Sequence, residues 1–303
     1  MAYSNPNGVA NTLADVPVYI KDLMDEVVAS ATLTADLSAD SRLARQVAGK
    51  KKVEIMSVTT DAPGNYSAHQ GYPLGKATAE WVEYTPGFDR AKQFVLDAVD
   101  ASSVELTATT VMSEFVRQYI VPEMDSVRLM RAASAAVTAG NTATVTPAAA
   151  SFLGQIVDAI DAVRDGARRE DGTVVYVNRK YKGMLSKSTE VTKSRDIAGG
   201  STSIKTGITD IDEAKVVYVP ASYMRTAFTA SDNGLTAGGK EVPFIAVAPG
   251  CVHGYTVHQA PKIIAPEVAQ DVDGWIIDYR VMFDALVLEN KTGGIYAPTI
   301  GSA

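Results

Sequence analysis

The pattern of apolar and polar positions predicts β-structure over much of the first hundred residues. Residues 53–58 alternate with a period of two, which is typical of a strand with one buried face. Residues 77–84 and 89–97 also alternate, and a Thr-Pro-Gly-Phe run at 85–88 separates them. These two segments are therefore predicted to pair as a hairpin with Pro-Gly at its turn. The intervening segment, 59–76, is rich in turn residues and is predicted to be a long functional or flexible loop.

A long helix is predicted to follow from Ser102. Val111, Phe115 and Tyr119 recur at four-residue spacing, which places them on one face of a helix. Pro122 interrupts the pattern, because proline lacks a backbone N–H and its ring clashes with the preceding turn, at a cost of about 3 kcal/mol in a straight helix. The helix is therefore predicted to kink or restart at Pro122. If its two parts stayed collinear they would span on the order of 50 Å.

The second half of the chain has the pattern of an αβ region followed by one long strand. An amphipathic helix is predicted from Thr146-Pro147 to about residue 169, and it would cover a sheet. The other predicted elements are strands at 173–177, 214–219, 243–248 and 275–287, short helices at 179–186 and 223–229, and flexible loops at 199–203 and 233–239.

Residues 1–50 are predicted to form an arm that packs on something else, because their few apolar residues could not close a core alone. One amphipathic helix is predicted at 18–28. The basic cluster between Arg42 and Lys52 is interpreted as the solvated entry to a strand, with docking on an acidic neighbour or on packaged nucleic acid as the alternative. The first residues show no signal-peptide pattern, so no secretion is expected.

Composition narrows the possible functions. Lys and Arg total 28 against 35 Asp and Glu, so the net charge of −7 disfavours a protein that reads DNA sequence. The single cysteine rules out an intramolecular disulfide framework. No apolar run approaches the roughly 18 to 20 residues that would span a bilayer, and no membrane association is expected.

Candidate catalytic groups are sparse. Cys251 and His253 would share one face of a strand, so a thiol–imidazole pair is geometrically possible, but a buried thiol beside a satisfied histidine is the favoured interpretation. Asp158, Asp161 and Asp165 lie on one side of a predicted helix and are interpreted as its solvent face. The sequence predicts no catalytic residue.

Candidate binding motifs also fail on spacing. The glycine-rich segment 71–77 has three residues where a phosphate-binding loop needs four, and it ends in alanine instead of Ser or Thr. Asp-rich turns at 210–213 and 271–274 lack the later glutamate of a calcium loop, and three histidines in total make a zinc site improbable. The sequence therefore predicts no metal and no cofactor.

Several short motifs occur in a distinctive order along nearly the whole chain. They are Asp89-Arg90 with Phe94 and Asp97, Pro122-Glu123-Met124-Asp125, Asp271-Val272-Asp273-Gly274-Trp275, Asp278-Tyr279-Arg280, Asp284-Ala285, Asn290-Lys291 and Gly294-Ile295-Tyr296. In this order the chain resembles the major capsid proteins of tailed bacteriophages that share the HK97-type fold.

The resemblance implies an α+β fold with an N-terminal arm, an extended E-loop hairpin, a peripheral domain with a long spine helix, and an axial α/β domain. The implied divisions are 1–50 for the arm, 51–100 for the E-loop and its flanking strands, 101–146 for the peripheral domain with the spine helix, 147–255 for the axial domain, and 256–303 for the return strand of the peripheral domain and the C-terminal segment.

The resemblance also implies a structural function. Such proteins assemble into hexamers and pentamers of an icosahedral head around double-stranded DNA, which they meet only by non-specific proximity, in the bacterial host cytoplasm. A separate scaffolding protein is expected because the first segment is short; portal and possibly decoration proteins are further expected partners. The candidate inter-subunit contacts are Trp81, Tyr84, Phe88, Arg90, Lys92, Glu123, Asp125 and Arg128.

Three alternatives remain open at this stage. Some members of the family crosslink a loop lysine to a neighbouring asparagine; Lys76, Lys92 and Asn290 lie in suitable regions, but no crosslink is predicted because surface lysines are common. An encapsulin-like nanocompartment shell would have the same fold. A cytosolic αβ enzyme using Cys251 and His253 is the alternative from another functional class.

Overall fold

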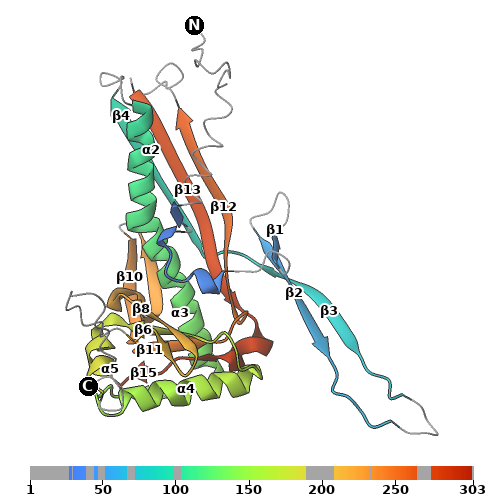
Figure 1. Ribbon diagram of the computed structural model, residues 1–303. Helices are drawn as coiled ribbons and strands as arrows, with labels where there is room; N and C mark the ends of the chain where they lie inside the picture. The colour runs from blue at the N-terminus through green and yellow to red at the C-terminus, as the bar shows by residue number, and fades with distance from the viewer. Residues whose placement is uncertain are drawn as a thin grey trace, which may run out of the picture.

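The computed structural model describes residues 27–28, 30–38, 44–46, 52–66, 72–97, 104–188, 208–232, 234–264 and 274–301. The helix predicted at 18–28, the loop at 199–203 and the Asp-rich turn at 271–274 lie wholly or largely outside these residues. The described part contains two main hydrophobic cores, which share one long helix (Figure 1).

The long helix continues through Pro122 in helical conformation, and it changes its type just before that residue. It consists of α2 (Val104–Phe115), the π-helical turn η3 (Val116–Ile120) and α3 (Val121–Ala139). The N–H of Val121 donates to the carbonyl of Val116, five residues back, and Pro122 then stands in the first turn of α3, where a missing N–H costs little. The helix ends at Gly140, whose φ of 82° is the left-handed conformation of a helix C-cap.

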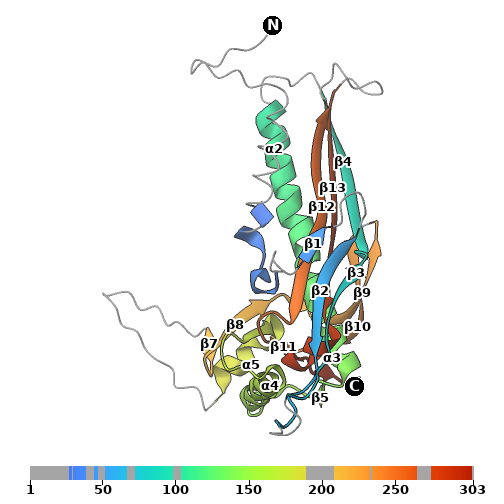
Figure 2. The same ribbon diagram turned by 90° about the vertical axis from the view of Figure 1, so that its right-hand side faces the viewer.

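A sheet with the strand order β12-β13-β4 packs along this helix (Figure 2). Its strands are β12 (Val252–Ile264), β13 (Gly274–Val287) and β4 (Phe88–Asp97). Ile277, Tyr279, Val281 and Phe283 alternate along β13 and are buried against Met112, Val116, Met124 and Val127 of the helix. The long final strand predicted at 275–287 is thus confirmed.

The predicted hairpin between residues 77–84 and 89–97 is wrong. Strand β3 (Ala77–Tyr84) instead pairs with β2 (Val53–Thr60), in a sheet whose third strand is β1 (Ala44–Gln46), and β4 pairs with β13. Burial explains the difference, because β4 places Phe88 in the core beside the long helix, whereas most of β3 is exposed. Pro86-Gly87 is therefore a crossing between two sheets, and the turn of the true hairpin lies within 61–76.

The second core lies at the other end of α3. Helix α4 (Phe152–Ala167) covers a sheet with the order β14-β11-β6-β8-β7, in which only β6 and β8 run parallel. These strands are β14 (Ile295–Tyr296), β11 (Phe244–Val247), β6 (Val174–Asn178), β8 (Ala214–Val219) and β7 (Asp210–Ile211). The short helical segments of the described chain are η1 (Ala35–Leu37), η4 (Arg179–Tyr181), α5 (Lys182–Lys187), η5 (Ala221–Tyr223) and η6 (Glu289–Gly294). The strands predicted at 173–177, 214–219 and 243–248 and the helix predicted at 179–186 are confirmed.

Three predictions in this region are wrong. The helix predicted from Thr146 begins at Phe152, because β5 (Thr144–Val145) pairs with β15 (Thr299–Ile300) and a turn at Ala148, whose carbonyl accepts from the N–H groups of Ser151 and Phe152, precedes the helix. The helix predicted at 223–229 and the loop predicted at 233–239 are instead strands, β9 (Arg225–Ser231) and β10 (Gly234–Glu241), which pair with each other and pack on α3. Glycines interrupt the alternation of apolar and polar residues that would otherwise predict β10 as a strand. One of them, Gly239, has a φ of 64° and lies at a register shift in the pairing of β10 with β9.

Candidate functional site

The hairpin of β2 and β3 projects from the body of the subunit (Figure 1). Its base is packed, since Val53 and Ile55 of β2 are buried with Tyr255, Met282 and Leu288. Burial decreases along both strands away from this base, and the distal part of each strand is exposed. The hairpin is therefore fixed at one end and has an open surface at the other.

The far end of the hairpin exposes large apolar side chains. Tyr66, Tyr72 and Leu74 are 63%, 87% and 104% exposed, and the two tyrosine rings lie 5.2 Å apart. The carboxylate of Asp61 accepts a hydrogen bond of 2.7 Å from the N–H of Lys76, which holds the two sides of the tip together. Exposed apolar groups gathered at the end of a projection mark an interaction surface.

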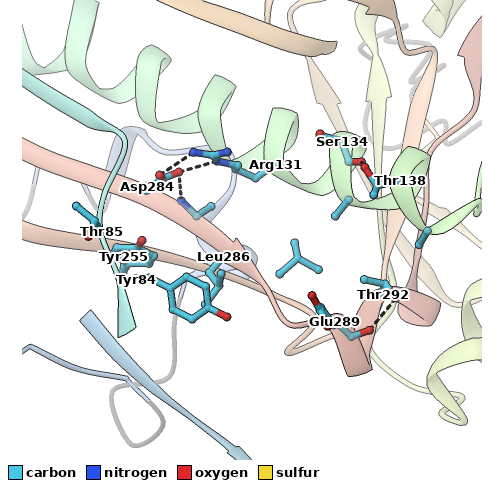
Figure 3. A pocket seen from close by; sticks show the side chains of 14 residues that line it. Tyr84, Thr85, Arg131, Ser134, Thr138, Tyr255, Asp284, Leu286, Glu289 and Thr292 are labelled. Atoms are coloured by element: carbon cyan, nitrogen blue, oxygen red, sulfur yellow. Dashed lines mark hydrogen bonds and ion pairs between the residues drawn. The ribbon is translucent and has the colours of Figure 1, made fainter. Parts of the chain in front are cut away.

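The base of the hairpin on its β3 side is held by a buried carboxylate (Figure 3). Asp284 of β13 accepts two hydrogen bonds of 2.8 Å from the guanidinium of Arg131, and a third of 2.8 Å from the N–H of Gly87. The hydrogen bonds to Asp284 raise the pKa of Arg131, and the ring of Phe88 lies under that guanidinium. We call Asp284, Arg131 and Gly87 the base clamp.

A cavity of about 600 Å³ adjoins the base clamp (Figure 3). Tyr84 and Thr85 border it on the hairpin side, Ser134 and Thr138 of α3 on the other, and Glu289 at one end. Burial and, less strongly, the charge of Glu289 raise the pKa of Tyr84. The side chains described here leave space between the end of β3 and the long helix.

The structure places four of the predicted contact residues of β3 and β4 in different environments. Trp81 and Lys92 are exposed, and their participation in contacts stays a prediction. Tyr84 is partly buried and lines the cavity. Phe88 is buried and stacks on Phe283 with 6.0 Å between ring centroids, so its side chain has its partner within the subunit.

Arg90 and Glu123, also predicted as contacts, pair with each other. Two hydrogen bonds of 2.8 Å join the Arg90 guanidinium to the Glu123 carboxylate, and a third, also 2.8 Å, joins it to the carbonyl of Ser231 in β9. This ties β4, α3 and the β9–β10 pair together in one chain. Whether either residue also contacts another subunit stays a prediction.

The last two predicted contacts, Asp125 and Arg128, are buried in α3. Asp125 accepts hydrogen bonds from the hydroxyls of Thr32 and Thr34 and from the N–H groups of Leu33 and Thr34. Arg128 donates to the carbonyl and hydroxyl oxygens of Thr34. Both side chains therefore fasten residues 32–34 of the predicted arm to the helix of the same subunit.

Sequence reasoning missed Tyr66, Tyr72 and Leu74 as surface candidates. The available signal was the presence of two tyrosines and a leucine in a segment otherwise made of turn residues. These side chains belong to the segment that was predicted as a loop. The contacts were instead predicted on the strands on either side of Pro86-Gly87.

The candidate enzymatic pair has the environment of a core. Cys251 is buried, and burial raises the pKa of its thiol, while His253 is buried near the start of strand β12. Asp158, Asp161 and Asp165 are exposed on α4, as predicted.

Within the described residues, no group of three or more His, Cys, Asp or Glu side chains could hold a metal ion. No helix of this part of the chain has the length and apolar character to cross a membrane.

Comparison with known proteins gives a structural match and no match in sequence. No family model matches the chain, and no curated protein is significantly similar to it. Among solved structures, the capsid of cyanophage P-SCSP1u is similar with a TM-score of 0.60 and 10% identity, covering 90% of this chain and 89% of that one. The bacteriophage PhiM1 mature capsid gives a TM-score of 0.58 at 13% identity with 84% of each chain covered, and Gordonia phage Cozz gives 0.56 at 9% with 90% and 87% covered.

The chain has a phage capsid fold. The matches cover most of this chain and most of each matched capsid chain, and the structure has the mixed arrangement of helix and sheet described above. The predicted α+β capsid fold is therefore confirmed. At identities of 9–13% the similarity establishes the fold alone.

Proposed function

We propose that this chain is a major capsid protein, a structural protein that assembles into the icosahedral head of a tailed phage. The observation that carries the proposal is the likeness to phage capsid structures, over 84% of the chain for bacteriophage PhiM1 and over 90% for cyanophage P-SCSP1u. The exposed apolar tip of the hairpin supports it, because such a surface serves contact between subunits better than it serves catalysis. No observation favours the enzyme or the nanocompartment alternative.

In this proposal the head consists of hexamers and pentamers around double-stranded DNA, so the protein resides in the virion after assembly in the bacterial host cytoplasm. A scaffolding protein, a portal and possibly decoration proteins would be its partners. The E-loop is reassigned to β2, β3 and the segment between them, ending at Tyr84, because β4 belongs to the sheet beside the long helix. Residues 101–146 and 256–303 would form the peripheral domain and 147–255 the axial domain.

Assembly of the purified chain tests the proposal. Sedimentation and electron microscopy of the expressed protein, with its neighbouring genes supplied, should reveal closed particles of megadalton mass. A chain that remains a stable monomer under all these conditions would contradict the capsid function. Terminase and portal genes beside its own gene would indicate a phage head, and a gene for a cargo enzyme would indicate a nanocompartment.

The hairpin tip is proposed as the contact with an adjacent copy. Replacing Tyr72 and Leu74 together by serine should abolish or strongly reduce assembly and leave the thermal midpoint of the subunit within a few degrees, because both side chains are exposed. Normal particles from this double variant would show that the tip is not needed as a contact between copies.

Denaturing gel electrophoresis of particles should show monomer bands only, and a ladder of higher bands would instead support a crosslink between Asn290 and Lys76 or Lys92.

A further inference from the structure

The crossing from β3 to β4 is fixed at one residue. Pro86 and Phe88 are buried, and the N–H of Gly87 between them donates to Asp284 at 2.8 Å. Asp284 also accepts from Arg131 through both carboxylate oxygens and receives the N–H of Ala285. Its side chain is only 5% exposed, so these hydrogen bonds form where competition from water is weak.

Packing alone does not hold this side of the hairpin. On the β2 side, Val53 and Ile55 are buried in an apolar cluster with β12 and β13. On the β3 side, the cavity of about 600 Å³ separates Tyr84 and Thr85 from the Ser134 and Thr138 face of α3 (Figure 3). The strand that leaves the body here therefore has room on the side of the helix. The base clamp opposes movement in that direction, together with the buried Phe88 and the pairing of Tyr84 with Val53 in β2.

We propose that the base clamp sets the direction in which the β2–β3 hairpin leaves the subunit. Asp284 and Arg131 are positioning residues in this sense: they act on the hairpin through the backbone of Gly87 and need not contact another subunit. For assembly the inference rests on the proposed capsid function, because a tip that docks on an adjacent copy must arrive at a set angle. For the isolated subunit it depends on the clamp geometry alone.

Gly87 offers a perturbation that leaves every charge in place. A Cβ at position 87 would lie 3.2 Å from Nη2 of Arg131 and 3.2 Å from Oδ2 of Asp284, which is tighter than ordinary van der Waals contact. Gly154, on the exposed face of α4, has no atom within 4 Å of the equivalent Cβ position. Gly154→Ala is thus a control for Gly87→Ala, with the same chemical change at a site away from the hairpin.

The first experiment measures the subunit without assembly. In Gly87→Ala and in Asp284→Asn, hydrogen exchange of the backbone amide at position 87 should accelerate by at least about tenfold, the effect of losing one hydrogen bond to a charged acceptor. The fluorescence anisotropy of Trp81, recorded in a Trp275→Phe background, should fall in both variants because the hairpin moves over a wider range. Gly154→Ala should leave both quantities unchanged.

The second experiment measures assembly. Gly87→Ala and Asp284→Asn should yield few closed particles or particles of altered diameter, at a subunit concentration where the wild type and Gly154→Ala form normal ones. Normal particles together with unchanged Trp81 anisotropy in both variants would overturn the inference. Failure of the wild type to assemble would count against the capsid function instead, and the exchange and anisotropy measurements would still decide the role of the base clamp.

Discussion

Replacing Asp125 by alanine tests the largest buried polar contact of the long helix. The carboxylate is 1% exposed and accepts four hydrogen bonds from residues 32–34, two from backbone N–H groups and two from hydroxyls. Arg128, one turn later, is also buried; burial lowers the pKa of its guanidinium, and the nearby charge of Asp125 opposes this. Alanine would leave several donors without an acceptor and a buried cation without its compensating charge.

The expected loss of stability follows from these contacts. An unsatisfied buried donor costs about 1–3 kcal/mol, and removing one partner of a buried charged pair costs about 3–5 kcal/mol. Residues 32–34 also follow Val27, which lies in one core, and precede Leu37, which lies in the other, so their release would expose apolar surface in both. We expect Asp125→Ala to destabilise the subunit by about 3–5 kcal/mol in total, because the individual losses are not additive.

Urea unfolding of the unassembled chain measures this loss. At a slope of roughly 3 kcal/mol/M, the midpoint should fall by about 1–2 M. Asp161→Ala, on the exposed face of α4, is the matched control and should shift the free energy of unfolding by no more than about 0.5 kcal/mol. Thr34→Val should lose part of its own effect in the Asp125→Ala background, since the two side chains share a hydrogen bond. An Asp125→Ala variant as stable as the control would refute the role assigned to these contacts.

Three further predictions concern other parts of the subunit. The buried thiol of Cys251, whose pKa is raised by burial, should react with a disulfide reagent on the order of 100-fold more slowly in the native chain than in urea, and a fast native reaction would revive the enzyme alternative. Burial acts to raise the pKa of Glu241, but hydrogen bonds from Lys180 and Tyr181 outweigh it and hold that pKa below its ordinary value of 4.5. Its contribution to stability is therefore present above about pH 4.5 and lost as the pH falls through the lower folded pKa, so acid titration of Glu241→Gln should show a shallower loss than that of the wild type. Pro122→Ala should change the free energy of unfolding by less than about 1 kcal/mol, because Pro122 lies in a first turn; a gain near 3 kcal/mol would indicate a strained helix.

The sequence predicted the elements whose pattern arises from their own residues. The strands at 174–178, 214–219 and 274–287 carry continuous or alternating apolar runs, and Pro122 marks the place beside which the long helix changes to a π-helical turn. Local chemistry of this kind is visible in one sequence without knowledge of the fold.

The failed predictions depended on partners distant in the chain. Nothing between residues 77 and 97 shows that β4 will pair with β13, nearly two hundred residues later. The strand character of β10 likewise arises from its pairing with β9 and its packing on α3, against a glycine-rich local sequence. The buried positions of Asp125 and Arg128 were missed for the same reason. Both side chains form hydrogen bonds with residues 32–34, which are about ninety residues away in the chain.

The two buried carboxylates of α3 and β13 suggest that geometry, more than stability, is what these polar contacts provide. Asp125 and Asp284 each lie on an element that both cores share. Asp125 holds the backbone of a segment that connects the two cores, and Asp284 holds the backbone beside the projecting hairpin. A buried charged pair is often no more stabilising than an apolar residue of similar volume, whereas its hydrogen bonds specify one arrangement. We therefore expect Asp284→Leu to recover much of the stability that Asp284→Asn loses, because Arg131 is 42% exposed and can turn to solvent, but not to restore Trp81 anisotropy or particle diameter. Thermal unfolding and electron microscopy of the two variants make the comparison. If Asp284→Leu restored both stability and particle geometry, packing alone would position the hairpin, and the carboxylate would have no directing role.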